Sequence, residues 1–250
     1  MIELKDINFS YTKDKAILSN FSMNIARGEF CSILGLNGIG KSTLIKIIAG
    51  YLKANSGSVE IAKKDIKSYS SLELAKIRSV LEQESELNFS YSVKEVVALG
   101  LFGYNSNSEF LEEIMQKCEI LELANRDYTS LSGGEKRRVS LARAIIQIYA
   151  EDMSDKILFL DEPSASLDPK HTILIMKLAK ELQSKKCTVI SILHDPNLAY
   201  TYSDKIVGIS DAKLAFSLSP QEFMQEDIIS KLYNCPCQIL KTESKTAVIF

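Results

Sequence analysis

Residues 35–43 read GLNGIGKST and carry the strongest indication of the fold class. They match the pattern G-x-x-x-x-G-K-[S/T] and lie between an apolar run, EFCSIL (29–34), and a helix-like segment from Leu44 to Ala49. In this strand–loop–helix order, backbone N–H groups close around phosphate oxygens at the N-terminus of the helix. The stretch therefore predicts a phosphate-binding loop.

Two residues of this loop point to catalysis. The Lys41 ammonium can neutralise phosphate oxygens, and the Ser42 hydroxyl can ligate Mg²⁺, which prefers oxygen donors. Such a loop needs a carboxylate at the end of a neighbouring buried strand, and ILFLD (157–161) followed by Glu162 supplies it. We expect Asp161 to hold Mg²⁺ through water and Glu162 to orient or deprotonate the attacking water.

Three more polar residues are candidates for the same site. His194 ends the apolar run TVISIL (188–193), where an open parallel sheet binds ligands, and it could contact a γ-phosphate or the attacking water. Gln83 ends another apolar stretch, and its amide could reach Mg²⁺ or the water, although an isolated glutamine would signal nothing. Tyr11 follows the first predicted strand, where its ring could stack on a base or serve packing alone.

The order of apolar segments predicts an α/β fold with a mostly parallel sheet covered on both faces. The predicted strands are 2–9, 29–35, 57–62, 157–161, 188–193 and 205–210. Helical spacing dominates 86–150, including a capping box from Ser92 to Glu95, so this stretch is an inserted α-helical subdomain. The predicted domains are a nucleotide-binding core (1–85 and 151–217), the helical subdomain (86–150) and a short C-terminal segment (218–250).

A second glycine-opened helix lies in that subdomain, at LSGGEKRR (131–138). Ser132 and Glu135 have capping-box spacing, yet each glycine between them costs about 1 kcal/mol relative to alanine in a helix. An anion that approaches bare backbone N–H groups would offset this cost. Since the first loop already holds its own nucleotide, we expect the second to cap a nucleotide held by another copy in a head-to-tail dimer. The basic run KRR (136–138) is expected to be the solvated face of the helix.

Composition is that of an ordinary globular protein. The 250 residues are 46% hydrophobic and 25% charged, and the formal net charge of -2 argues against a nucleic-acid partner. The apolar runs are too short to span a bilayer, and charges in the N-terminal pattern exclude a signal peptide. The five cysteines suit reduced thiols in the cytoplasm, and Cys235 and Cys237 form a lone C-x-C, which is a weak metal or redox signal.

Together these motifs resemble the ATP-binding cassette (ABC) ATPase family, from Tyr11 to about residue 210. GLNGIGKST corresponds to Walker A, Gln83 to the Q-loop, LSGGE to the signature, ILFLDE to Walker B, SASLD (164–168) to the D-loop and His194 to the H-loop. The resemblance implies a P-loop NTPase core, partly antiparallel at its N-terminus, with ATP sandwiched between Walker A of one subunit and the signature of its partner. Arg137 stands at a position often held by glutamine in that family.

The resemblance also implies roles for individual residues. Tyr11 would stack on adenine, Ser132 and Gly134 would contact the γ-phosphate in trans, and Asp168 would bridge the dimer. The implied catalytic residues are Glu162 as base, His194 on the γ-phosphate, Gln83 and Lys41. The implied ATP-binding residues are Tyr11, Gly35, Asn37, Gly38, Gly40, Lys41, Ser42, Thr43 and Asp168, with Ser132, Gly133, Gly134 and Glu135 acting in trans. The implied Mg²⁺ ligands are Ser42, Gln83 and Asp161.

Two segments resemble a subclass of that family. FSYSVKEVVALGLFGY (89–104) and the tail at 220–240 are similar to those of iron–siderophore, haem and cobalamin importers. This implies a homodimer at the cytoplasmic face of the membrane, docked on permease chains and served indirectly by a substrate-binding protein. A metal-ion importer or an exporter would show the same motifs. Soluble ABC ATPases fit less well, because those of DNA repair insert long coiled coils and those of translation carry two cassettes.

Overall fold

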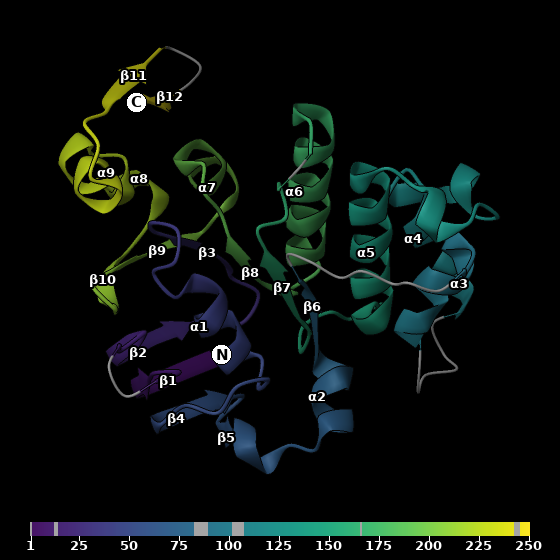
Figure 1. Ribbon diagram of the computed structural model, residues 1–250, viewed down its shortest axis with the longest axis horizontal. Helices are drawn as coiled ribbons and strands as arrows, with labels where there is room; N and C mark the ends of the chain where they lie inside the picture. Colours follow the sequence, from purple (N-terminus) through teal and green to yellow (C-terminus); the bar gives the residue numbers. More distant parts are fainter. Residues whose placement is uncertain (1, 13–14, 83–89, 102–107, 166, 243–245) are drawn as a thin grey trace. The chain divides into compact units, whose positions relative to one another are not determined.

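The P-loop strand and helix lie in the first of two compact units (Figure 1). The computed structural model describes residues 2–12, 15–82, 90–101, 108–165, 167–242 and 246–250. The first unit spans Met1–Ser70 and Ile190–Phe250, and the second spans Ser71–Val189. Among the described residues, no helix combines the length and the apolar character needed to cross a membrane.

The first unit opens with an antiparallel sheet. Its strands are, in spatial order, β2 (Leu18–Ile25), β1 (Ile2–Phe9), β4 (Ser56–Ile61) and β5 (Lys64–Asp65). In β1 the buried apolar residues are Ile2, Leu4, Ile7 and Phe9. The step from Leu4 to Ile7 is odd, so a simple alternation would turn the second pair outward. A register shift at this step, with Asp6 at φ 49°, keeps both pairs buried.

The same unit contains the parallel strands that carry the P-loop. β3 (Phe30–Leu34) pairs in parallel with β9 (Lys205–Ser210), and β10 (Lys213–Leu218) pairs antiparallel with β9. All of β3 is buried, which explains its unbroken apolar run. α1 (Lys41–Ile48) follows β3 through the P-loop. The other elements of this unit are η1 (Ile66–Ser68), α7 (Pro196–Tyr202), α8 (Pro220–Phe223), α9 (Glu226–Tyr233), β11 (Gln238–Lys241) and β12 (Thr246–Ile249).

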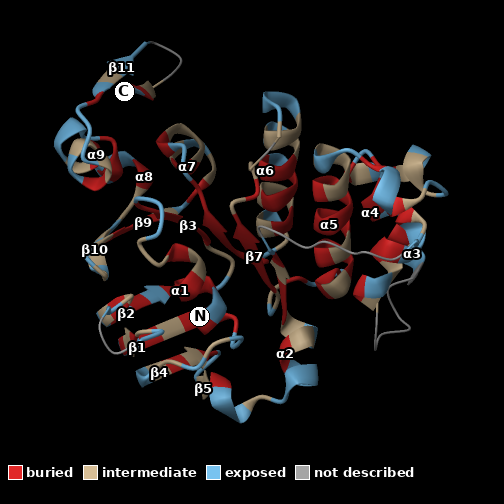
Figure 2. Ribbon diagram, viewed as in Figure 1, coloured by how far each residue is buried: buried red, intermediate tan, exposed pale blue. Residues whose placement is uncertain are grey.

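The second unit is built around one long helix, α5 (Gly133–Ile148). It packs against α2 (Ser71–Ile77), α3 (Val93–Ala98), α4 (Leu111–Lys117) and the strand β6 (Arg78–Leu81). Much of α5 is buried, as Figure 2 shows. Because neighbours surround it, this helix can bury polar as well as apolar side chains.

The remainder of the second unit is a strand–helix pair that follows α5. β7 (Ile157–Asp161) pairs in parallel with β6, and α6 (Pro169–Ser184) comes next along the chain. β8 (Thr188–Ile192) then leads back into the first unit. The short 3₁₀ helices of this unit are η2 (Leu99–Leu101), η3 (Ser108–Phe110), η4 (Leu121–Leu123) and η5 (Tyr128–Ser130).

The predicted α/β class is confirmed, with parallel strands, flanking helices and an antiparallel N-terminal sheet. Each strand expected from the sequence is present, within one or two residues at its ends. The sequence did not predict β2, β5, β6, β10 or the C-terminal hairpin of β11 and β12. The two compact units divide the chain after residues 70 and 189, at positions other than the predicted domain boundaries. The predicted boundaries at 85/86, 150/151 and 217/218 remain a prediction.

Candidate functional site

The P-loop in the first unit is a cradle of backbone N–H groups that requires glycine at two positions. Gly35 and Gly40 have φ of 148° and 109°, which side chains rarely adopt. A Cβ at Gly35 would lie 2.6 Å from the Ile209 carbonyl oxygen, and one at Gly40 would lie 2.7 Å from Cγ2 of Ile17. The N-cap of α1 is Gly40, which makes no side-chain cap hydrogen bond, and the N–H groups at a helix start favour an anion. The crest of the loop, 37–38, is exposed.

Lys41 places a positive charge inside this loop. The residue is buried, and its Nζ donates hydrogen bonds to the carbonyl oxygens of Gly35 (2.8 Å) and Leu36 (2.9 Å). These bonds hold the ammonium against the backbone that forms the cradle. With the helix N-terminus, the ammonium creates a positive potential suited to a polyphosphate. Ser42 follows in the first turn of α1, half-buried.

Tyr11 and His194 belong to the same unit as the P-loop. Tyr11 is 61% exposed. Its ring packs edge-on against Phe9 with 4.9 Å between centroids, and its hydroxyl lies 3.2 Å from Oγ1 of Thr43 in α1. An exposed ring beside the P-loop helix is free to stack on a base. His194 is exposed just after β8, and its carbonyl oxygen accepts a hydrogen bond from the Tyr233 hydroxyl at 3.1 Å.

In the second unit, β7 ends in the predicted acidic pair. Every residue of β7 is buried, and Asp161 at its end is 5% exposed. Glu162 is half-buried and has φ of 49°, in the left-handed region that non-glycine residues occupy mainly in turns and at functional sites. The predicted Gln83 lies outside the described residues.

The start of α5 is capped as predicted. The Ser132 hydroxyl oxygen accepts a hydrogen bond from the Glu135 N–H at 3.3 Å, and Oε2 of Glu135 accepts from the Ser132 N–H and hydroxyl, each at 2.7 Å. The hydrogen bonds from the Ser132 backbone and side chain lower the pKa of Glu135. A Cβ at Gly133 would meet nothing described within 4 Å, and one at Gly134 would lie 3.5 Å from Cδ2 of Leu167. Internal packing therefore does not explain these glycines, whereas close approach of a ligand would.

Asp168 has a structural role within its own chain. It is the N-cap of α6, where its carboxylate accepts a hydrogen bond from the His171 N–H at 2.9 Å and lies 2.9 Å from Nδ1 of the same residue. The backbone hydrogen bond, followed by the bond to the His171 ring, lowers the pKa of Asp168. The side chain is exposed, which a residue that bridges two subunits also requires.

The expectation for the basic run of α5 is wrong at two positions. Arg137 and Arg138 are each only 8% exposed, instead of lying on a solvated face. Arg137 donates hydrogen bonds to backbone carbonyls at the carboxyl ends of β6 and β7. The signal that could have found them is helical periodicity, because both arginines lie one turn before the buried pair at 141–142.

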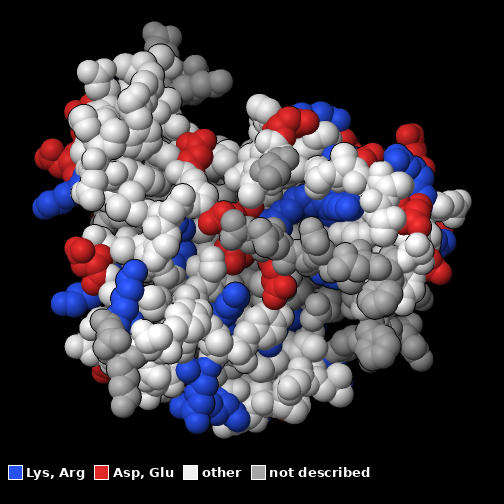
Figure 3. Space-filling model, viewed as in Figure 1, with Lys and Arg blue, Asp and Glu red and all other residues white. Residues whose placement is uncertain are grey.

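Two surface features lie apart from these motifs. Lys, Arg, Asp and Glu are interspersed over the face shown in Figure 3, without one dominant sign of charge.

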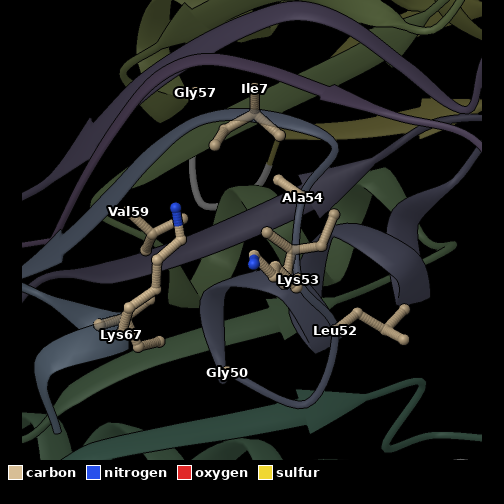
Figure 4. Close-up of a pocket in the computed structure, with 10 residues that line it drawn as sticks. Ile7, Gly50, Leu52, Lys53, Ala54, Gly57, Val59 and Lys67 are labelled. Atoms are coloured by element: carbon tan, nitrogen blue, oxygen red, sulfur yellow. The ribbon is translucent and has the colours of Figure 1, made fainter.

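A cavity of about 130 Å³ in the first unit (Figure 4) has apolar walls that include Ile7, Ile47 and Val59, with Lys53 and Lys67 beside them. None of the predicted site residues lines this cavity, so it is not part of the candidate site.

The geometry agrees with a comparison to known families. The sequence profile described as ABC transporter matches residues 18–165, more than half of the chain. The chain belongs to the ABC transporter family. It is therefore an ATP-binding protein and an ATPase of that family, and the resemblance inferred from the motifs is confirmed.

Individual relatives extend the match to nearly the whole ABC ATPase. The chain is 37% identical over 244 residues to the hemin import ATP-binding protein HmuV of Escherichia coli O157:H7, covering 96% of this chain and 95% of that protein. It is 36% identical over 248 residues to the protein of the same name from Shewanella denitrificans, covering 97% of each. A solved dimeric ATP-binding cassette in a post-hydrolysis state with ADP and Pi is 27% identical, with a TM-score of 0.76, covering 88% of this chain and 99% of that one.

The predicted site residues of this ABC ATPase are divided between its two units. The first unit contains the P-loop, Tyr11 and His194, and the second contains Asp161, Glu162, the start of α5 and the D-loop. Within the first unit the structure brings Tyr11 to the P-loop helix. Within the second it brings α5 to the ends of β6 and β7. The roles of the individual residues remain predictions.

Proposed function

We propose that this chain is the ATP-hydrolysing subunit of an importer for an iron–siderophore, haem or cobalamin-type complex. The observation that carries the proposal is the similarity, over nearly the full length, to proteins named for hemin import. The chain works as a homodimer attached to the cytoplasmic face of the membrane. Permease chains supply the pathway, and a substrate-binding protein delivers the solute to them.

ATP binds first at the P-loop. The N–H groups of the loop and of the first turn of α1 bind the phosphates, with Lys41 neutralising the β- and γ-oxygens. The exposed ring of Tyr11 stacks on adenine, and its hydroxyl contact with Thr43 keeps the ring close to the P-loop helix. Asn37 and the neighbouring Gly38, exposed at the loop crest, complete the contacts from this side.

The residue types of the site suit Mg²⁺. The Ser42 hydroxyl, the Asp161 carboxylate and the Gln83 amide oxygen are the hard oxygen donors that this ion prefers, and nucleotide phosphates and water complete its usual six ligands. Among the described residues there is no cluster of three His, Cys, Asp or Glu side chains that could hold a metal ion. When bound, Mg²⁺ neutralises charge on the transferred phosphoryl group.

Glu162 accepts a proton from the attacking water, and His194 orients the γ-phosphate. A base at the end of a buried strand is held firmly, which proton transfer to a defined oxygen requires. Both side chains keep some exposure to solvent, so each is accessible to water. The proton of the attacking water passes to the carboxylate as the bond from water oxygen to phosphorus forms and ADP leaves.

The start of α5 completes the site of a second copy. The N–H groups of Gly133 and Gly134, with the Ser132 hydroxyl, bind the γ-phosphate of the partner's nucleotide at a helix N-terminus. Glu135 holds Ser132 in place through the capping box. The exposed Asp168 contacts the partner across the twofold axis. A head-to-tail dimer therefore contains two composite sites.

The substitution Glu162→Gln tests the catalytic assignment. ATP binding should persist, hydrolysis should fall by about 100-fold or more, and an ATP-dependent dimer should accumulate, because the amide cannot accept the proton. Phosphate release measures hydrolysis, and light scattering with Mg²⁺ and ATP measures the dimer. The exposed Glu122 of the same unit provides the control substitution Glu122→Gln, which should change neither. Undiminished turnover of the Glu162 variant would refute the base assignment.

The solute class requires a membrane experiment. The chain should co-purify with a polytopic permease, and its ATPase activity in liposomes containing that permease should rise when a haem-loaded binding protein is added. An equal response to an unloaded binding protein would remove support for haem-type import. Recovery with an exporter-type permease that needs no binding protein would overturn it.

A further inference from the structure

Arg137 is a buried guanidinium that the proposed mechanism has not used. Its Nη2 donates hydrogen bonds to the carbonyl oxygens of Asp161 at 2.7 Å and Glu162 at 2.8 Å, and its Nη1 donates to the carbonyl oxygen of Glu82. Since β6 and β7 are parallel neighbours, with Leu81 opposite Leu160, their carboxyl ends lie side by side. One side chain of α5 therefore ties together the ends of both strands.

The contact depends on the backbone conformation of Glu162. In an extended strand successive carbonyls point to opposite sides, so the two N–H groups of one guanidinium nitrogen cannot reach two carbonyls in a row. The left-handed φ of 49° at Glu162 turns its peptide so that two successive carbonyls face Arg137. Such a conformation carries a cost and persists only where its surroundings hold it. The guanidinium is positioned to do so.

Arginine suits this place better than glutamine, which the family often has there. A guanidinium offers five N–H donors in a rigid planar fork, whereas a glutamine amide offers two. Burial lowers the pKa of Arg137, and the nearby carboxylates of Asp161 and Glu162 partly oppose this effect. The Arg137 guanidinium thus also places a positive charge beside the backbone of Asp161 and Glu162.

We propose that Arg137 is a positioning residue for ATP hydrolysis, which fixes the left-handed backbone of Glu162 and so aims its carboxylate. The inference rests on the proposed role of Glu162 as base. Arg137 lies in α5, about one turn after the Ser132 cap, and its third acceptor is the carbonyl oxygen of Glu82, the residue before Gln83. It therefore connects the start of α5, which carries the signature, to the end of β7, which carries Glu162. Binding of a partner's nucleotide at that helix start and orientation of the base are connected through one side chain.

The test compares Arg137→Gln and Arg137→Lys with Arg138→Gln, which removes a guanidinium that is equally buried. Arg137→Gln should lower kcat for ATP by roughly 10- to 100-fold and leave KM within about threefold, because misplacing a reacting group affects chemistry more than binding. Arg137→Lys, which keeps the charge and loses the fork, should fall between wild type and Arg137→Gln. Arg138→Gln should stay within about twofold of wild type. Wild-type kcat in Arg137→Lys, or an equal loss in Arg138→Gln, would overturn the proposal.

A double-mutant cycle separates positioning from a general structural effect. Single-turnover hydrolysis is measured for wild type, Arg137→Gln, Glu162→Gln and the double variant. If Arg137 acts through Glu162, its substitution should have little further effect once the carboxylate is gone. An equal fold-loss in both backgrounds would show that Arg137 acts elsewhere and would reject the inference. Full activity of Glu162→Gln would instead reject the proposed function itself, so the two failures are distinguishable.

Discussion

The double substitution Gly133→Ala and Gly134→Ala should make the chain more stable and less active. Glycine in a helix costs about 1 kcal/mol relative to alanine, and somewhat less in the first turn. The new methyl groups would meet nothing described within 4 Å at Gly133 and only Cδ2 of Leu167, at 3.5 Å, at Gly134. The gain should therefore survive in full, at roughly 1–2 kcal/mol for the pair. For a chain of this size that corresponds to a rise in Tm of about 2–8 °C.

The activity should change in the opposite direction. Two methyl groups at the helix start keep a phosphate away from the backbone N–H groups that should bind it in trans. The monomer should bind ATP normally at its own P-loop, whereas ATP-dependent dimerisation and hydrolysis should fall by at least tenfold. Thermal unfolding, nucleotide binding by the monomer, and light scattering with ATP measure the three quantities on one preparation.

Gly100 is the matched control from the same unit. A Cβ there would lie 2.4 Å from the Arg143 carbonyl oxygen and 2.6 Å from Cγ2 of Ile146, so Gly100→Ala should lower stability by about 1–3 kcal/mol through overpacking. If the double variant at residues 133 and 134 were destabilised as well, its glycines would be structural. If it dimerised and hydrolysed ATP like wild type, the start of α5 would not be part of a composite site.

Three further predictions concern the cap and the thiols. Ser132→Ala should lower the free energy of unfolding by about 1 kcal/mol and also weaken ATP-dependent dimerisation. Ser92→Ala, which removes the same type of capping box, should lower the free energy of unfolding and leave dimerisation unchanged. Equal dimerisation defects in the two variants would contradict the role of Ser132. Folding lowers the pKa of Glu135, so the ionised Glu135 carboxylate stabilises the fold above its unfolded pKa, and this stabilisation is lost as the pH falls through its folded pKa. The loss of unfolding free energy caused by Ser132→Ala, measured by urea unfolding, should therefore become smaller from pH 7 to about pH 3. Of the five cysteines only Cys235 is exposed, so a thiol reagent should label it in seconds to minutes and the other four only on unfolding; rapid labelling of more than one would refute this.

The local features of the candidate site could be predicted from short stretches of sequence. The P-loop, the acidic end of β7 and the capping box at Ser132 each depend on residues that lie close together in the chain. Their physical causes are equally local, since a helix start needs an acceptor three residues before the N–H that it caps, and a phosphate cradle needs glycines at fixed spacing. The strands with long apolar runs were predictable for the same reason. A strand that is buried on both faces consists of consecutive apolar residues.

Strands without such runs escaped prediction. β6 has only four residues and directly follows α2, so its sequence continues the helix without a turn signal. In β1 the predicted strand was correct, but a register shift was needed to bury its second apolar pair. The strand β6 and the register shift in β1 both depend on pairing with segments distant in the sequence, and such pairing is only weakly reflected in the residues of the strand itself.

The α/β class, the family and the residue types available for ATP hydrolysis could be predicted from the sequence, because they follow from local chemistry and spacing. The contacts of Arg137, by contrast, are visible only in the folded chain. Its letter in a basic run suggested a solvated face, but α5 packs against β6, and the free energy of a buried guanidinium depends on which acceptors surround it. Those acceptors are backbone carbonyls of residues 82, 161 and 162, and no side-chain pattern in the sequence encodes where a carbonyl points.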